Sequence, residues 1–141
     1  ITAGSPIDGY QINYFGHGGD DVIWGSAYAN IDGGAGDDII NGGYGNNTLT
    51  GGSGADIFEF TATSGNDTIT DYNQRDGDVL RLYRRSTDTS EVSVDAVQDK
   101  ITWQADGHVV TIDFDTDITA TNVTIEYELI WLRLINLPIK L

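Results

Sequence analysis

A glycine-rich repeat of nine residues, running from Gly16 to Phe60, is the feature that most constrains this chain. From Gly33 onward each unit opens with two glycines, while the unit around Ile31 is one residue shorter. When the units are aligned, two columns of residues recur. The acid or amide column is Asp21, Asn30, Asp38, Asn47 and Asp56, and the apolar column is Ile23, Ile31, Ile40, Leu49 and Phe58.

Such a unit has too few apolar residues to bury a core alone, so the pattern predicts stacked units that align their apolar residues in one seam. A flexible linker is the alternative, but a linker has no reason to repeat an apolar residue at fixed spacing. Ordering each glycine-rich loop costs about 1–2 kcal/mol per residue in entropy. The thin apolar seam does not offset that cost, so we expect a bound group to hold the loops.

The charge pattern indicates what that group is. No Lys or Arg occurs before Arg75, and the whole chain carries a net charge of −15. Aligned carboxylates repel one another unless cations lie between them. Carboxylate and carbonyl oxygens in flexible loops suit Ca²⁺, which takes about six to eight oxygen ligands. We therefore expect this half of the chain to be expanded without calcium and compact with it.

The units match the pattern G-G-x-G-x-D-x-U-x, where U is a large apolar residue, and in this the chain resembles the RTX (repeats-in-toxin) family. The resemblance implies an all-β fold, a right-handed parallel β-roll in which two units make one coil. It also implies several Ca²⁺ ions and an exported bacterial protein that leaves the cell by type I secretion.

The resemblance further implies that each ion lies between loops two units apart. Carried over to this sequence, the first site joins His17, Gly19 and Asp21 to Gly33, Ala35 and Asp38. The second site joins Gly34, Gly36 and Asp38 to Gly51, Ser53 and Asp56.

The opposite side of the roll departs from the pattern. Asn30 and Asn47 replace aspartates there, and Tyr28 replaces a glycine, so we expect a weak or empty site between those two loops. A further site is expected to join Gly43, Gly45 and Asn47 to Asp67. Asp20 and Asp37, beside the acid column, are expected to be plain solvated charges.

Three parts of the chain are expected: an entry segment with a degenerate turn (1–15), the calcium-binding roll (16–60) and a β-rich C-terminal flank and cap (61–141). Alternation predicts short strands on both sides of a turn at residues 74–78, and another strand around Ile125. The Asp106-Gly107 pair predicts a hairpin in which Trp103 faces Val110. Apolar and other residues alternate over 135–141 around Pro138, which suggests an edge strand or cap. The segment does not by itself indicate a secretion signal.

The composition excludes several functions. Acids outnumber bases 22 to 7, which argues against nucleic acid or an anionic membrane as a partner. No run reaches the length of a membrane span. The chain has no Cys and no Met, so calcium replaces disulfides as a staple and the chain is expected to be part of a larger secreted protein. We expect no enzyme, because His17 and His108 lack partners for a catalytic set.

The favoured function is therefore a calcium-binding module that folds outside the cell and supports the export of a larger protein. Two alternatives stay open. One is a polysaccharide-binding module like the R-modules of secreted mannuronan C-5 epimerases, with Tyr10, Tyr14, Tyr28 and Tyr44 as stacking candidates. The other is a fragment of an RTX adhesin.

Overall fold

The computed structural model describes residues 10–84, 92–105, 107–119 and 122–129. Within those ranges every regular element is a strand. The strands are β1 (Ile12–Phe15), β2 (Val22–Trp24), β3 (Ala29–Ala35), β4 (Ile39–Asn41), β5 (Thr48–Ser53), β6 (Ile57–Phe60), β7 (Asn66–Ile69), β8 (Val79–Arg84), β9 (Val92–Asp95), β10 (Lys100–Ala105), β11 (His108–Phe114) and β12 (Ile125–Leu129).

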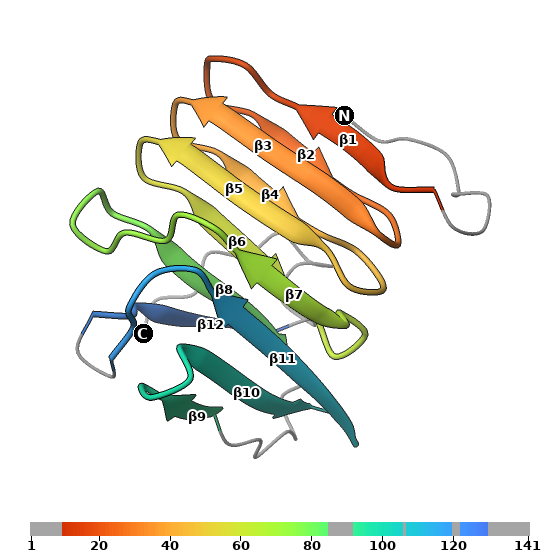
Figure 1. Ribbon diagram of the computed structural model, residues 1–141, viewed down its shortest axis with the longest axis vertical. Helices are drawn as coiled ribbons and strands as arrows, with labels where there is room; N and C mark the ends of the chain where they lie inside the picture. The colour runs from red at the N-terminus through yellow and green to blue at the C-terminus, as the bar shows by residue number, and fades with distance from the viewer. Residues whose placement is uncertain (1–9, 85–91, 106, 120–121, 130–141) are drawn as a thin grey trace.

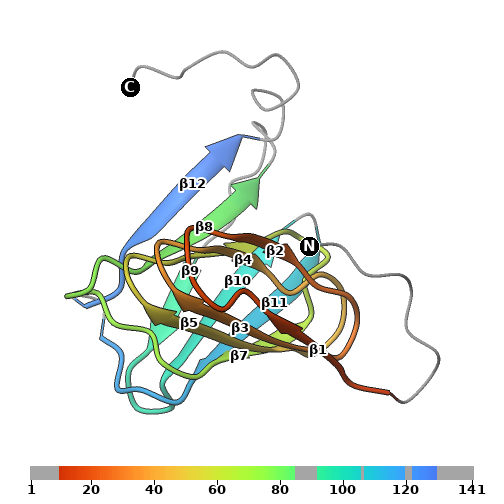
Figure 2. The same cartoon turned by 90° about the horizontal axis from the view of Figure 1, so that it is seen from above.

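The first eight strands form a parallel roll, because each strand pairs with the strand two places along the chain (Figure 1). Odd strands belong to a seven-stranded sheet in the order β1-β3-β5-β7-β11-β10-β9, and even strands to a five-stranded sheet in the order β12-β8-β6-β4-β2. Seen along the stack, the coils overlie one another as a flattened ring with one sheet on each side (Figure 2). The expected all-β parallel β-roll is confirmed.

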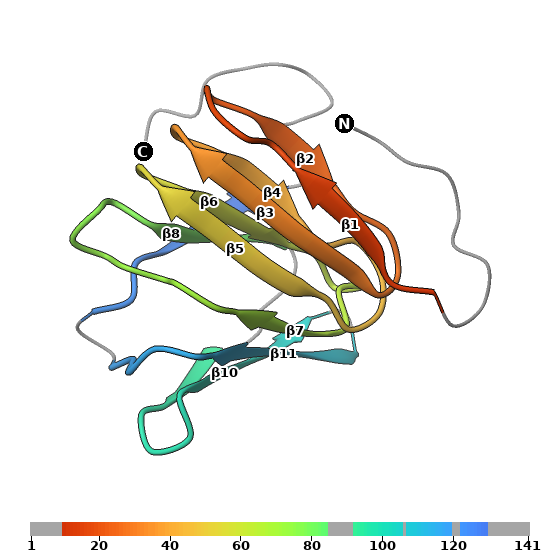
Figure 3. The same ribbon diagram turned by 45° about the horizontal axis from the view of Figure 1, so that its top comes forward.

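The coils stack as the repeat predicts (Figure 3). In the five-stranded sheet Ile23, Ile40, Phe58 and Leu80 are adjacent in register, and all four are fully buried. In the other sheet Tyr14, Ile31, Leu49 and Ile69 form the matching row. The seam runs on beyond the sequence repeat, since Leu80 and Ile69 follow Phe60.

One column assignment was wrong. Asn30 was expected in the acid or amide column, but it pairs with Thr48, so the residue aligned with Asn47 is Ala29. The Nδ2 group of Asn30 instead donates to Oδ1 of Asn13 on the outer surface, at 3.1 Å. The deletion in this short unit therefore removes the acid position itself. Ile12 pairs with Ala29, so the entry turn also has an apolar residue at this position.

The C-terminal flank continues the roll and does not form a separate unit. β11 pairs with β7 in parallel, and β10 and β9 then add antiparallel strands. The hairpin register is confirmed, with Trp103 facing Val110 and Ile101 facing Ile112. The strands expected on both sides of residues 74–78 are β7 and β8, which lie in different sheets. The expected strand at residues 135–141 and the turn residue Asp106 lie outside the described residues.

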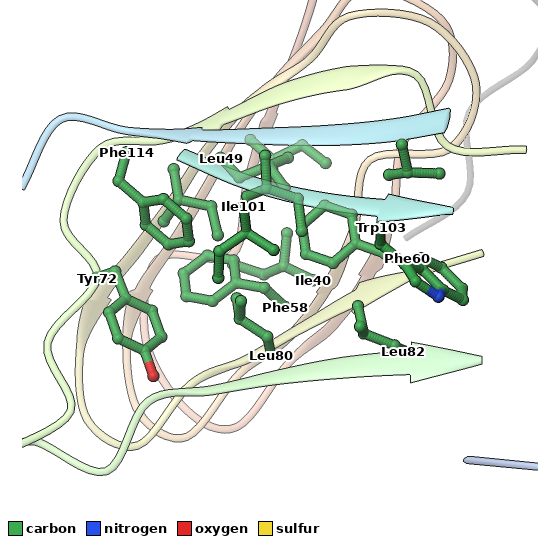
Figure 4. Close-up of a cluster of buried hydrophobic side chains, with 14 of the residues drawn as sticks. Ile40, Leu49, Phe58, Phe60, Tyr72, Leu80, Leu82, Ile101, Trp103 and Phe114 are labelled. Atoms are coloured by element: carbon green, nitrogen blue, oxygen red, sulfur yellow. The ribbon is translucent and has the colours of Figure 1, made fainter. Parts of the chain in front are cut away.

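One hydrophobic cluster spans the roll and the flank (Figure 4). Phe58 of the roll lies beside Tyr72, with ring centroids 6.5 Å apart, and Tyr72 meets Phe114 of β11 edge-on at 5.5 Å. Trp103 of β10 is fully buried in the same cluster. The repeat units therefore share their core with a flank that carries most of the large side chains.

Because that core is shared, we predict that Trp103→Ala destabilises the whole molecule in a single transition. Removing a buried Trp costs about 3–5 kcal/mol. Urea denaturation in calcium, followed by tyrosine fluorescence and by circular dichroism, should show coincident curves shifted together. Val97→Ala is the control, since Val97 is 93% exposed and should change stability by less than about 0.5 kcal/mol. Two separate transitions would contradict the shared core.

Candidate metal centre

Two columns of residues mark the turns of the roll. Column I consists of Asp21, Asp38, Asp56 and Asp78, which immediately precede the paired strands β2, β4, β6 and β8. Column II consists of Ile12, Ala29, Asn47 and Asp67, which take the same place in the turns of β1, β3, β5 and β7. Sequence reasoning missed Asp78, although it stands two residues before Leu80 as Asp56 stands before Phe58.

Column I is connected by hydrogen bonds from one coil to the next. The backbone N–H of Asp21 donates to Oδ1 of Asp38 at 2.8 Å, and that of Asp38 donates to Oδ1 of Asp56 at 2.9 Å. The N–H of Asp56 donates to Oδ1 of Asp78 at 3.1 Å. The carboxylates of Asp38, Asp56 and Asp78 thus each accept a hydrogen bond at Oδ1, and this bond fixes where Oδ2 lies.

The second oxygen of most column carboxylates is buried without a partner. This is true of Oδ2 on Asp21, Asp38, Asp56 and Asp67. An unpaired buried carboxylate oxygen is costly, and buried charges are normally paired or bound to a metal. The recurrence of the same orphaned atom in coil after coil indicates a set of positions built to receive cations.

The glycines beside these oxygens leave room for a close approach. A Cβ on Gly33 would lie 2.4 Å from Oδ2 of Asp38 and 2.6 Å from the carbonyl oxygen of Gly51. A Cβ on Gly51 would lie 2.3 Å from Oδ2 of Asp56. Glycine at these positions therefore lets a carboxylate oxygen and a carbonyl oxygen gather in space that any other residue would fill.

The expected carbonyl ligands lie in facing loops. The carbonyl oxygen of His17 accepts the N–H of Ala35 at 3.0 Å, and that of Ala35 accepts the N–H of Gly19 at 2.7 Å. One coil further, the N–H of Gly36 donates to Ser53 at 2.9 Å. The structure therefore brings together the loops of both expected ligand sets on column I. Each carbonyl keeps a second lone pair that a cation can use.

Burial changes the acidity of the column. It raises the pKa of both Asp56 and Asp67 from 3.8 to about 6, and it raises the pKa of Asp38 as well. At Asp56 the nearby carboxylates of Asp78 and Asp38 raise the pKa further, whereas the hydrogen bond from the Asp38 N–H lowers it. Without a cation, the fold thus penalises the charged form of these acids.

Asp20 and Asp37 do more than the sequence predicted. Both are exposed, as expected of solvated charges. Yet Oδ1 of Asp20 accepts the N–H of Asp37 at 2.9 Å, and Oδ1 of Asp37 accepts the N–H of Ala55 at 2.8 Å. These side chains reach toward the following coil, opposite to column I, and join the same loops a second time.

In the described part of the chain, no three His, Cys, Asp or Glu side chains lie close enough together to hold a metal by themselves. An ion at column I would instead draw on two carboxylates and the carbonyls of the loops. Such an all-oxygen donor set suits Ca²⁺ better than a metal that prefers nitrogen or sulfur.

Comparison with protein families identifies this region. The model of the RTX calcium-binding nonapeptide repeat, in four copies, matches residues 15–30 and 30–58. These residues are RTX repeats. The matched repeats end at residue 58, so Asp67 and Asp78 lie outside them although their coils continue the roll.

The wider comparisons add little to this. No curated protein matches the chain as a relative. Among solved structures, the solution structure of the AlgE6R2 subunit of the Azotobacter vinelandii mannuronan C5-epimerase is 20% identical, with a TM-score of 0.47. The match covers 87% of this chain and 97% of that one.

The raised pKa values of the column acids predict a pH dependence for the calcium-free roll. Asp56 and Asp67 bind a proton more tightly in the folded chain, with a pKa of about 6, than in the unfolded chain, with 3.8. The folded state therefore gains stability as the pH falls from about 6 toward 4, and loses that gain again as the pH rises. Circular dichroism in chelator should show more folded protein at pH 5 than at pH 8. A calcium-free fold that is less stable at pH 5 would contradict this.

Proposed function

We propose that this chain is a calcium-binding RTX module whose repeats fold when they bind Ca²⁺ outside the cell. The observation that carries the proposal is the set of buried carboxylate oxygens without partners on Asp21, Asp38, Asp56 and Asp67. A fold that repeats the same unmet acceptor in successive coils is incomplete without cations. Oxygen donors of this kind select a hard cation, and Ca²⁺ tolerates the irregular geometry of glycine loops.

Two ions are proposed along column I. The first lies between the loops that contain Asp21 and Asp38, with the carbonyls of His17, Gly19, Gly33 and Ala35. The second lies between the loops that contain Asp38 and Asp56, with the carbonyls of Gly34, Gly36, Gly51 and Ser53. Asp38 serves both ions in this arrangement, and its complete burial supports a central role.

Asp78, the last residue of column I, has hydrogen bonds to both of its carboxylate oxygens. Oδ1 of Asp78 accepts the N–H of Asp56, and its Oδ2 accepts the N–H of Asn73 at 2.7 Å. Both oxygens are therefore used, unlike those of Asp38. We propose that hydrogen bonds close this last turn in place of an ion.

For the further site expected at Gly43, Gly45, Asn47 and Asp67, the support is uneven. Oδ2 of Asp67 is buried and unpartnered, and a Cβ on Gly65 would lie 2.1 Å from the carbonyl oxygen of Gly45. Gly65, two residues before Asp67, thus lies against the carbonyl of Gly45 in the preceding coil. The side chain of Asn47, however, is engaged in hydrogen bonds of its own.

Folding coupled to calcium suits export from the cell. An ion that binds only the folded form stabilises it by about 1.4 kcal/mol per site at tenfold excess over the dissociation constant. Extracellular calcium modules bind at roughly 10⁻⁴–10⁻³ M, so the chain would stay unfolded in a calcium-poor cytosol. An unfolded chain can pass through an export channel and fold outside, as part of a larger secreted bacterial protein. The acids are committed to the columns, so we propose a binding module and no enzyme.

Within the described residues no helix combines the length and the apolar character needed to cross a bilayer.

We predict that Asp38→Ala is the most damaging change in the acid column, because it removes a ligand from both proposed ions. Circular dichroism during a calcium titration should show a β-type spectrum that appears with calcium and not with magnesium. In Asp38→Ala the midpoint should rise about tenfold or more. Asp20→Ala is the matched control, since Asp20 is an exposed neighbour of the column whose oxygen bonds only an N–H. A larger effect from Asp20→Ala would overturn the column assignment.

A polysaccharide-binding surface is the second candidate, and one observation favours it. Three tyrosines lie exposed in successive turns on the side of column II: Tyr10 at 72%, Tyr28 at 55% and Tyr44 at 67%. Exposed aromatic rings of this kind can stack on sugar rings. Tyr14, the fourth candidate, is 4% exposed, and its hydroxyl lies 3.1 Å from that of Ser26, so it packs in the core and is removed from the set.

Calorimetric titration with neutral and acidic oligosaccharides in calcium buffer tests this second candidate. If the tyrosines bind sugar, Tyr44→Ala should weaken the affinity by about tenfold, which is about 1.4 kcal/mol. Tyr127→Ala is the control, because Tyr127 is similarly exposed but belongs to β12 of the other sheet. Absence of heat with every sugar would remove the candidate and leave the calcium module standing.

A further inference from the structure

Asn47 differs from the aspartates of both columns in how its side chain is used. Its Oδ1 accepts the N–H of Ala29 at 2.8 Å, as the aspartates accept an N–H from the preceding coil. Its Nδ2 group donates to Oδ1 of Asp67 at 2.8 Å and to the carbonyl oxygen of Tyr44 at 3.3 Å. Asn47 therefore leaves no buried polar atom without a partner, in contrast to Asp38 and Asp56.

The amide nitrogen occupies the place that the aspartates give to an oxygen. A Cβ on Gly42 would lie 2.8 Å from Nδ2 of Asn47. The equivalent glycines, Gly33 and Gly51, face the Oδ2 atoms of Asp38 and Asp56 at 2.4 and 2.3 Å. Where the other turns present an acceptor to a cation, this turn presents two N–H donors.

The orientation of the amide is dictated by its neighbours. Reversing it would place the NH₂ group against the N–H of Ala29 and the oxygen against the carboxylate of Asp67. Both contacts would then be repulsive. The donor thus points at the carbonyl of Tyr44, the third residue of its loop, which in column I is a proposed calcium ligand.

We infer that Asn47 replaces an ion in its turn: its amide joins three successive coils, through Ala29, its own loop and Asp67, without calcium. The inference deepens the proposed function and rests on calcium binding by the aspartates. It assigns the metal dependence of the roll to the turns whose acid keeps an unpartnered oxygen, and not to the turn of Asn47. In the turn of Asn47 the coils are joined by a neutral group that needs no cation, whereas Oδ2 of Asp67 in the next turn of column II stays without a partner.

The decisive variant is Asn47→Asp, which exchanges the donor for a second carboxylate oxygen and frees the carbonyl of Tyr44. Native mass spectrometry and calorimetry should then count one more calcium ion per chain than in the unaltered protein. Asn30→Asp is the matched control, because it adds the same charge on the neighbouring strand, where the Asn30 side chain hydrogen-bonds Asn13 on the outer surface. It should add no ion. Asn47→Ala should keep the ion count and lower the midpoint of thermal unfolding in calcium.

Two results would overturn the inference: loss of an ion in Asn47→Ala, or no gain in Asn47→Asp. If the variants do not fold, hydrogen exchange of the unaltered protein still tests the inference. The two side-chain N–H signals of Asn47 should exchange slowly with solvent in calcium. Rapid exchange would also overturn it. An unaltered protein that folds with no calcium bound would instead overturn the proposed function. The exchange of the amide signals would still show whether the Asn47 side chain joins the coils.

Discussion

The burial of a row of carboxylates between stacked coils is the constraint on which this structure depends. Parallel strands lie about 4.7–4.9 Å apart, so residues that repeat once per coil are stacked at that spacing. Stacking joins apolar side chains into a seam, but it also stacks Asp21, Asp38 and Asp56. The carboxylates of Asp38 and Asp56 each accept one N–H from the preceding coil, and all three acids keep one buried oxygen without a partner. The same geometry therefore stabilises the core and leaves buried charge that cations, protons or further hydrogen bonds have to compensate.

The structure solves that problem differently at different turns. Beyond the last repeat, Asp71 receives the N–H groups of Gly51 and Gly52 at 2.9 and 2.7 Å, and Asp78 uses both of its oxygens. At the other end, Ile12 and Ala29 place no charge in column II at all. Asn47 supplies a neutral amide between them and Asp67. The orphaned oxygens thus lie on Asp21 at the edge of its sheet, on Asp38 and Asp56 between two coils, and on Asp67 in the turn of β7.

Much of this arrangement was predictable from residue spacing. The period of the apolar residues predicted the stacked coils, and the Asp-Gly turn predicted the register of Trp103 against Val110, because both depend on local patterns. What spacing did not predict depends on insertions and deletions. The shortened unit put Ala29, not Asn30, in column II, and a longer connection concealed Asp78 as the continuation of column I. Nor does composition distinguish a solvated acid from one whose oxygen caps an N–H, as Asp37 does for Ala55.

The C-terminal flank explains how so thin a seam is part of a cooperative fold. In a stack of repeats, stability is roughly the sum of each coil's own term and its contacts with neighbours. A central coil buries two medium-sized apolar residues, whereas the flank buries Trp103, Ile101 and Ile112. The flank is joined to the roll by the pairing of β11 with β7. The strands β7 and β8, which border this better-packed part, pair in register with β5 and β6. Because Tyr72 contacts both Phe58 and Phe114, the flank and the last repeat coil are joined by direct packing. In the proposed function, calcium neutralises the acids of the repeat coils, while the packing of the flank supplies apolar burial that the thin seam lacks.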